Sequence, residues 1–159
     1  MLMKMSKRER AISIINSQNK LEMIQTRQEF ISIDNALSEL SKSRKKLLGR
    51  IHSQESEFRA MQQPGALLDL HRFIEIGAWL SSAGEDLKAL DMSIDDMESA
   101  LRTQLEKLAR LEAAQEVIKQ KLLDERALKW AELESRAERD LSELTNAKNA
   151  QSMELSYGA

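Results

Sequence analysis

The sequence contains no cysteine, one proline and five glycines, and aromatic residues make up only 4% of its 159 positions. Without cysteine there can be no disulfide bond, no catalytic thiol and no cysteine-ligated zinc. With so few turn residues and aromatic side chains, an all-β sandwich or barrel would lack both its connections and its core. The abundant Leu, Ile, Met, Ala, Glu, Lys and Arg are typical of helices. We therefore expect a single all-α domain of nearly continuous helix.

The charges of the chain nearly cancel, with 24 Lys and Arg against 26 Asp and Glu and a net charge of -2. No global positive field exists to hold the chain on nucleic acid or on anionic lipid. No apolar run approaches the roughly 20 residues of a membrane span. Polar residues from Asn16 to Lys20 follow the basic N-terminal region too soon for a signal peptide. We expect a cytoplasmic protein with no membrane insertion and no bound nucleic acid.

Apolar residues recur at alternating spacings of four and three between Ile12 and Phe58. This spacing defines fourteen positions, of which nine are apolar. The pattern predicts a coiled-coil helix over about residues 3–61. Polar residues occupy the remaining positions and can fix the register, because mispairing would bury them without partners. Among them are Asn16, Asn19, Thr26 and Arg44.

The only strong helix breaker is the segment Gln62 to Gly65, which contains Pro64. A second pattern runs from Leu80 to Glu125, with eleven of fourteen positions apolar, and predicts a helix over about 80–146. The segment 62–79 is then a break and tip, and the small, polar tail 147–159 is expected to fray. Past Leu122 the apolar stripe shifts to Leu123, Ala127, Trp130, Ala137, Leu141 and Leu144, and we interpret Trp130 as a space-filling residue of this seam.

Two helices with so short a break can bury their stripes by folding into an antiparallel hairpin. Pairing Phe58 with Leu80 sets Leu37 against Leu101 and Phe30 against Leu108. This register places the basic run 42–50 opposite the acidic group 85–98. A parallel dimer would instead bring like charges together, so we expect a monomeric hairpin.

The residue types that carry catalysis or bind metals are scarce or badly spaced. His52 and His71 lie on opposite sides of the break, without a carboxylate at metal-ligand spacing in an apolar pocket. The acidic group 85–98 lies on a two-helix hairpin, which has no concave cavity to desolvate a carboxylate. No glycine-rich phosphate loop is present. We expect a protein that is not an enzyme and has no metal and no cofactor.

Apolar side chains just after the break exceed what one seam can bury. They form a candidate partner-binding tip, made of Phe73, Ile74, Ile76 and Trp79. The alternative is that this cluster packs on itself and closes the end of the hairpin.

This layout resembles the FliJ/YscO (SctO) family, the central stalk proteins of flagellar and virulence type III secretion systems. The resemblance covers nearly the whole chain as architecture, and its more specific part is Leu70, Phe73 and Ile74 after the break. The second helix also fits, with its stretch 122–126 and Trp130. Gly77 departs from the family pattern, which usually has an apolar residue there. The composition of the break favours the virulence branch.

The resemblance implies a stalk that docks in a hexameric type III secretion ATPase and modulates its activity. It also implies contacts with the export gate subunit and with export chaperones, and a location beside the inner-membrane export apparatus. We expect the base to enter the ATPase ring, through Met5, Arg8, Ile12, Leu133, Arg136 and Leu141. Two alternatives stay open: a coiled-coil scaffold or prefoldin-like chaperone, and a helical nucleic-acid-binding arm, which would need an unpaired basic stripe.

Overall fold

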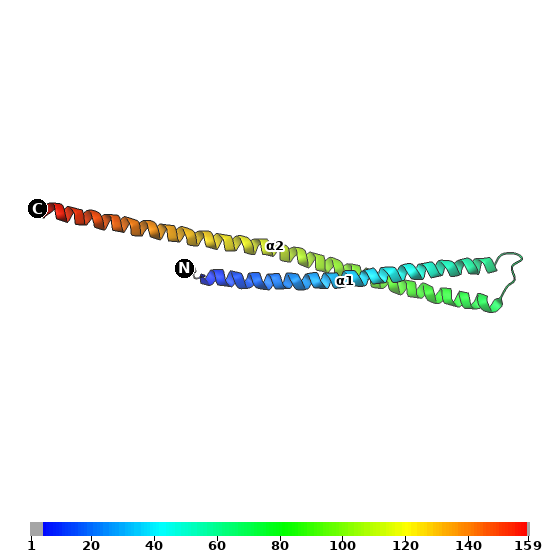
Figure 1. Cartoon of the computed structure of the whole chain (residues 1–159). Coiled ribbons are helices and arrows are strands. Elements are labelled where there is room, and N and C mark those ends of the chain that lie inside the picture. Colours follow the sequence, from blue (N-terminus) through cyan, green and yellow to red (C-terminus); the bar gives the residue numbers. More distant parts are fainter. Residues whose placement is uncertain (1–4, 159) are drawn as a thin grey trace. The chain divides into compact units, whose positions relative to one another are not determined.

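The computed structural model describes residues 5–158, and two long helices account for nearly all of them. Helix α1 is Lys7–Met61 and helix α2 is Leu70–Tyr157. They pack against each other in opposite directions (Figure 1), and the described residues contain no strand. The prediction of an all-α helical hairpin is confirmed. Residues 3 and 4 of the predicted first helix and residue 159 of the predicted tail lie outside the described residues.

The contacts within the chain group its residues into two compact units. Unit 2 is Glu22–Arg110 and contains the turn between the helices. Unit 1 consists of the N-terminal residues through Leu21 together with the chain from Leu111 onward. In each unit, a segment of α1 lies antiparallel to a segment of α2.

The seam between the helices follows the predicted pattern closely. Each of the fourteen predicted positions between Ile12 and Phe58 is buried or half-buried, and so is each of the fourteen between Leu80 and Glu125. A helix with 3.6 residues per turn turns only such a stripe toward its partner. Spacing alone therefore identified the packed faces of both helices.

Helix α2 begins at Leu70, ten residues earlier than the sequence pattern predicted. Asp69 caps this end, because its Oδ1 accepts a hydrogen bond of 3.1 Å from the backbone N–H of Arg72. The three-four spacing also extends back from Leu80 through Ile76 to Phe73, so these residues continue the seam. Residues 70–79 of the predicted break and tip over 62–79 are therefore the first turns of α2.

The connection between the helices is a short loop built around Pro64 and Gly65. Gly65 has φ +85°, a conformation that side-chain-bearing residues rarely adopt, and the N–H of Ala66 donates to the carbonyl of Gln63 at 3.2 Å. Proline followed by a positive-φ glycine inside such a bond is the pattern of a type II turn. This loop reverses the chain within Gln62 to Asp69.

The predicted register is wrong. Phe58 stacks on Phe73 instead of facing Leu80. The turn is centred at Pro64 and Gly65, whereas the predicted register required a centre near residue 69. The sequence argument failed because it started α2 ten residues too late.

The end of α2 also differs from the prediction. The helix continues through Tyr157, so residues 147–157 are helical where a frayed tail was predicted. Trp130 is 60% exposed and is not a seam residue, and Leu123, Leu141 and Leu144 are exposed as well. Where α2 still packs against α1, the half-buried positions continue at Glu125 and Lys129. The predicted shift of the seam by one residue does not occur there.

Neither helix, over the residues that the structure describes, contains a stretch long and apolar enough to cross a membrane.

Candidate functional site

The inner side of the turn end in unit 2 is an apolar cluster. The rings of Phe58 and Phe73 stack with centroids 4.4 Å apart and planes 15° apart. Ile76 is 1% exposed, and a Cβ added to Gly77 would lie 3.7 Å from the Phe58 ring, an ordinary contact. Two residues of the predicted tip, Phe73 and Ile76, thus pack within the unit, as the alternative interpretation of that cluster predicted.

An ion pair crosses the seam beside this cluster. Arg72 donates from Nε and Nη2 to the two carboxylate oxygens of Glu57, at 2.9 and 3.1 Å. These hydrogen bonds lower the pKa of Glu57 and, together with the nearby negative charge, raise that of Arg72. The two-pronged geometry fixes the register at the turn end.

The outer side of the turn end carries exposed apolar side chains, which we call the turn patch: Leu67, Leu68, Leu70 and Ile74. Leu67 is fully exposed, and the other three are 55 to 62% exposed. Of the predicted tip, only Ile74 belongs to this patch. Sequence reasoning missed Leu67 and Leu68, although two leucines directly after a proline-glycine turn are a signal for exposed apolar residues.

A groove of unit 2 is lined by Trp79 and by Ile76, a residue of the apolar cluster described above. The guanidinium carbon of Arg50 lies 5.2 Å from the centre of the Trp79 ring, within the range of a cation–π interaction. The groove has a volume of about 550 Å³. Its lining combines charged, polar and apolar side chains: Arg50, Ser53, Gln54, Arg72, Glu75, Ile76, Ala78 and Trp79.

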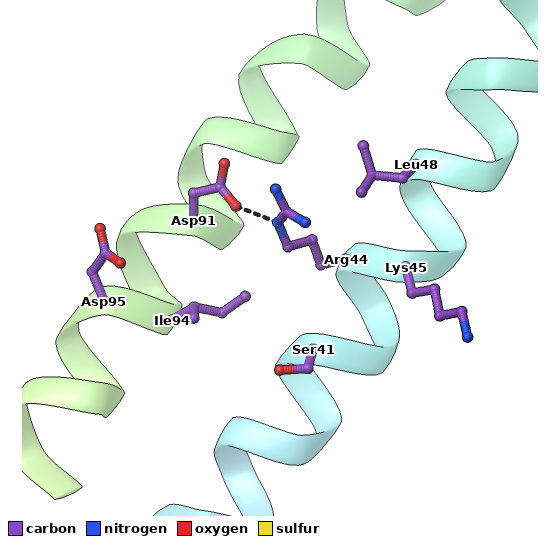
Figure 2. A pocket seen from close by; sticks show the side chains of 7 residues that line it. All are labelled: Ser41, Arg44, Lys45, Leu48, Asp91, Ile94 and Asp95. Carbon is purple, nitrogen blue, oxygen red and sulfur yellow. Dashed lines mark hydrogen bonds and ion pairs between the residues drawn. The ribbon is translucent and has the colours of Figure 1, made fainter.

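A second cleft of unit 2, of about 590 Å³, is centred on an ion pair between Arg44 and Asp91 (Figure 2). Asp95 and Ile94 line the cleft on the same helix as Asp91, while Lys45 points away from them. Both partners of the pair are more than 40% exposed, so the pair adds little stability. Of the predicted basic run 42–50, Arg44 thus contacts a residue of the predicted acidic group 85–98.

The seam of unit 1 contains a network of hydrogen bonds between polar side chains. The Nδ2 of Asn19 donates to the carbonyl of Leu111 at 3.2 Å and to Oε1 of Gln115 at 2.8 Å. The Nε2 of Gln115 donates in turn to Oδ1 of Asn16 at 2.7 Å. In this alignment Asn16 and Asn19 have hydrogen-bond partners, whereas the buried Oγ1 of Thr26, another polar residue of the predicted seam, has none among the described residues.

The start of α1 is tied to α2 through Glu9. Ser6 and Glu9 form a reciprocal capping box, with both backbone-to-side-chain hydrogen bonds at 3.0 Å. Glu9 is only 6% exposed and pairs with Lys129 at 3.3 Å and with Arg126 at 4.0 Å. The hydrogen bond from the Ser6 backbone, followed by that from Lys129, lowers the pKa of Glu9.

The predicted base residues are not brought together as expected. Arg8 lies 3.9 Å from Glu125, and Ile12 lines a hollow with Lys121 and Glu125. Met5 lines a hollow with Trp130. The other three predicted residues, Leu133, Arg136 and Leu141, lie farther along α2, in a stretch where every described residue after Trp130 is exposed.

This stretch, residues 131–157, we call the free segment. Within the described residues of unit 1, α2 continues past Lys7, the first residue of α1, with no helix packed beside it (Figure 1). Its exposed large apolar residues are Leu133, Leu141, Leu144, Met153, Leu155 and Tyr157. A helix this apolar with no partner offers a surface for another protein.

Comparison of this chain with protein-family models, curated proteins and solved structures gives no match. Within residues 5–158, no three His, Asp or Glu side chains are grouped closely enough to hold a metal ion. The observations that bear on function are therefore the turn patch, the two grooves of unit 2 and the free segment.

Proposed function

We propose that this chain is a non-enzymatic central stalk of a type III secretion system. It docks through its base in the hexameric export ATPase, modulates ATP hydrolysis, and links the ATPase to the export gate and to export chaperones. It works in the cytoplasm, beside the inner-membrane export apparatus.

The free segment is the observation that carries this proposal. A stalk must present a stiff element to a surrounding ring, and a helix held at one end by its partner provides one. In unit 1 the seam between Glu9 and Lys129 anchors α2, and the free segment continues from that anchor. Leu133, Arg136 and Leu141 stay in the proposed ATPase contact, because all three are exposed there.

The opposite contact, with the export gate, uses the turn patch in this proposal. Phe73 and Ile76 are engaged in the inner cluster, so they are not free to bind a partner. Leu67, Leu68 and Ile74 are exposed on the outer side of the same turn. Trp79 remains accessible only along the groove that it shares with Arg50.

Truncation after Trp130 tests the proposal, with purified export ATPase and this chain as the assay components. The full chain should bind the ATPase and change its rate of ATP hydrolysis, and the truncated chain should do neither. In chains that also carry Trp130→Phe, unchanged emission of Trp79 would show that unit 2 stays folded after the truncation.

The matched control is Leu67→Ser, which changes the turn patch and leaves the free segment intact. It should retain the full effect on ATP hydrolysis and lose affinity for the export gate. If the truncated chain still stimulates the ATPase, the base assignment is wrong. If the full chain does not bind the ATPase, the stalk function is wrong.

A further inference from the structure

The Lys and Arg side chains of a basic stretch of α1 form one ion pair across the seam among the described residues. Residues 42–59 contain six Lys and Arg but only two Glu. Arg44 reaches Asp91 across the seam, whereas the ion pair of Lys42 is with Glu39 of its own helix. Among the described residues, no carboxylate lies within ion-pair distance of the Arg50 guanidinium, which rests on Trp79. Unit 2 therefore has an unneutralised cation at the mouth of a groove.

The groove beside Arg50 has the features of a helix-binding surface. Ile76, Ala78 and Trp79 supply its apolar part, and Ser53 and Gln54 supply hydrogen-bonding groups. Arg72 is held by Glu57 and lies 3.9 Å from Glu75, the carboxylate of the groove lining, so Arg50 is the cation available to a new partner. A matching ligand is a helix with an apolar stripe and carboxylates at its edge.

The free segment of α2 has this composition. Residues 131–157 contain six Asp and Glu against three Lys and Arg. Leu133, Ala137, Leu141 and Leu144 follow one another at spacings of four, four and three, so they share one face of the helix. Glu134 lies at one edge of this face and Asp140 at the other. All six residues are exposed.

We propose that the free segment of one copy docks into the Arg50–Trp79 groove of a second copy. The opposite charges of the two surfaces favour this pairing, and the apolar stripe covers the exposed part of Trp79. The contact is heterologous, since the two surfaces differ, and it therefore adds further copies head to tail. A single helix in a shallow groove buries less than a stable interface needs, so the association is weak and concentration-dependent.

Sedimentation of the full chain over a range of concentrations tests the proposal. At about 50 mM salt the mean mass should rise above that of the monomer with concentration, and at about 500 mM salt it should return to the monomer. Arg50→Glu should weaken the association on the order of tenfold or more, because it places a carboxylate opposite the acidic segment. Arg102→Glu is the matched control, since it reverses an exposed charge of unit 2 outside the groove, and it should have no effect.

A mixing experiment identifies the two surfaces. The Arg50→Glu chain keeps its free segment but loses its groove, and a chain with Glu134→Gln and Asp140→Asn keeps its groove but loses the charges of its segment. Each should be monomeric alone, whereas the mixture should form one-to-one pairs that grow no further. In chains carrying Trp130→Phe, the emission of Trp79 should shift when these pairs form.

Three outcomes would overturn the proposal: a full chain that stays monomeric at low salt, a mixture that stays monomeric, or Arg50→Glu chains that associate as well as the unchanged chain. The helical circular dichroism and thermal unfolding of each variant alone show whether it is still folded. These experiments use this chain alone, so their result is independent of any contact with an ATPase.

Discussion

The two units use the same pair of helices but hold them together by different chemistry. In unit 2, the stacked rings of Phe58 and Phe73 and the buried Ile76 and Ala83 form an apolar seam. In unit 1, Ile118 is the only apolar residue among those described that is buried to a comparable degree. The rest of its seam is dominated by polar groups, such as Asn19, Gln115 and Glu9.

The two kinds of seam contribute differently to the stability of the hairpin and to the alignment of its helices. Apolar contacts supply most of the free energy of packing, but they tolerate a shift of one helix along the other. Hydrogen bonds add less net free energy, but a shift leaves buried polar groups unpaired, which is costly. Unit 2 should therefore be the more stable unit, and unit 1 the one whose alignment is most strictly specified. Four predictions test or refine this contrast.

The largest effect is expected from Ile76→Ala. Ile76 is 1% exposed, so its truncation should lower the free energy of unfolding of unit 2 by about 3 to 4 kcal/mol through lost burial and a cavity. Ile118→Ala in unit 1 should cost only about 2 kcal/mol, because Ile118 is 9% exposed and its surroundings are more open. Urea unfolding measures both values, with Trp79 reporting on unit 2 and Trp130 on unit 1 in single-tryptophan chains. Equal losses would contradict the contrast between the seams.

The second prediction compares two glutamines of the α2 seam. Gln115→Leu should lower the stability of unit 1 by about 1 to 2 kcal/mol, because Asn16 and Asn19 lose their hydrogen bonds to it. Gln104→Leu in unit 2 should leave stability unchanged or raise it by up to about 1 kcal/mol, because the buried Oε1 of Gln104 has no hydrogen-bond partner. Thermal and urea unfolding measure the change in stability of each variant and its sign. A loss at Gln104 as large as that at Gln115 would mean that polar seam positions are equivalent in the two units.

The third prediction concerns pH. The pKa values of Glu9 and Glu57 are lowered in the folded chain, so below the ordinary value of 4.5 the unfolded chain binds protons first. Their contribution to stability is therefore complete above pH 4.5 and is lost as the pH falls toward the folded pKa values. Glu9→Gln should reduce this acid sensitivity in unit 1 alone, and Glu57→Gln in unit 2 alone, as seen by Trp130 and Trp79. A change in the other unit would contradict the separate placement of the two carboxylates.

The smallest effect on stability is expected from the turn patch. Leu67 is fully exposed, so Leu67→Ser should change the free energy of unfolding by no more than about 0.5 kcal/mol. Phe73→Ala, only a few residues away, should cost about 3 kcal/mol, because the Phe73 ring stacks on Phe58. Calorimetry on the two variants separates exposed from packed apolar residues at the same end of unit 2. A large loss for Leu67→Ser would show that Leu67 packs in solution.

The sequence determined the helices and their packed faces. Every position of the three-four spacing from Ile12 to Phe58 and from Leu80 to Glu125 lies in the seam, because a helix with a fixed number of residues per turn presents only one such stripe. The end of α1 at Met61 was also predictable from Pro64. These features depend on neighbours within a few residues, which the sequence displays directly.

Only the tertiary structure decided the register and, with it, the candidate sites. Sliding one helix past the other by a turn or two leaves both stripes facing each other, so periodicity cannot choose among the alignments. The choice came from contacts between distant residues, such as Phe58 with Phe73 and Asn19 with Gln115. Those contacts placed Arg50 over Trp79 and left Trp130 exposed, and neither result follows from local sequence, because each depends on which residue of the other helix lies opposite.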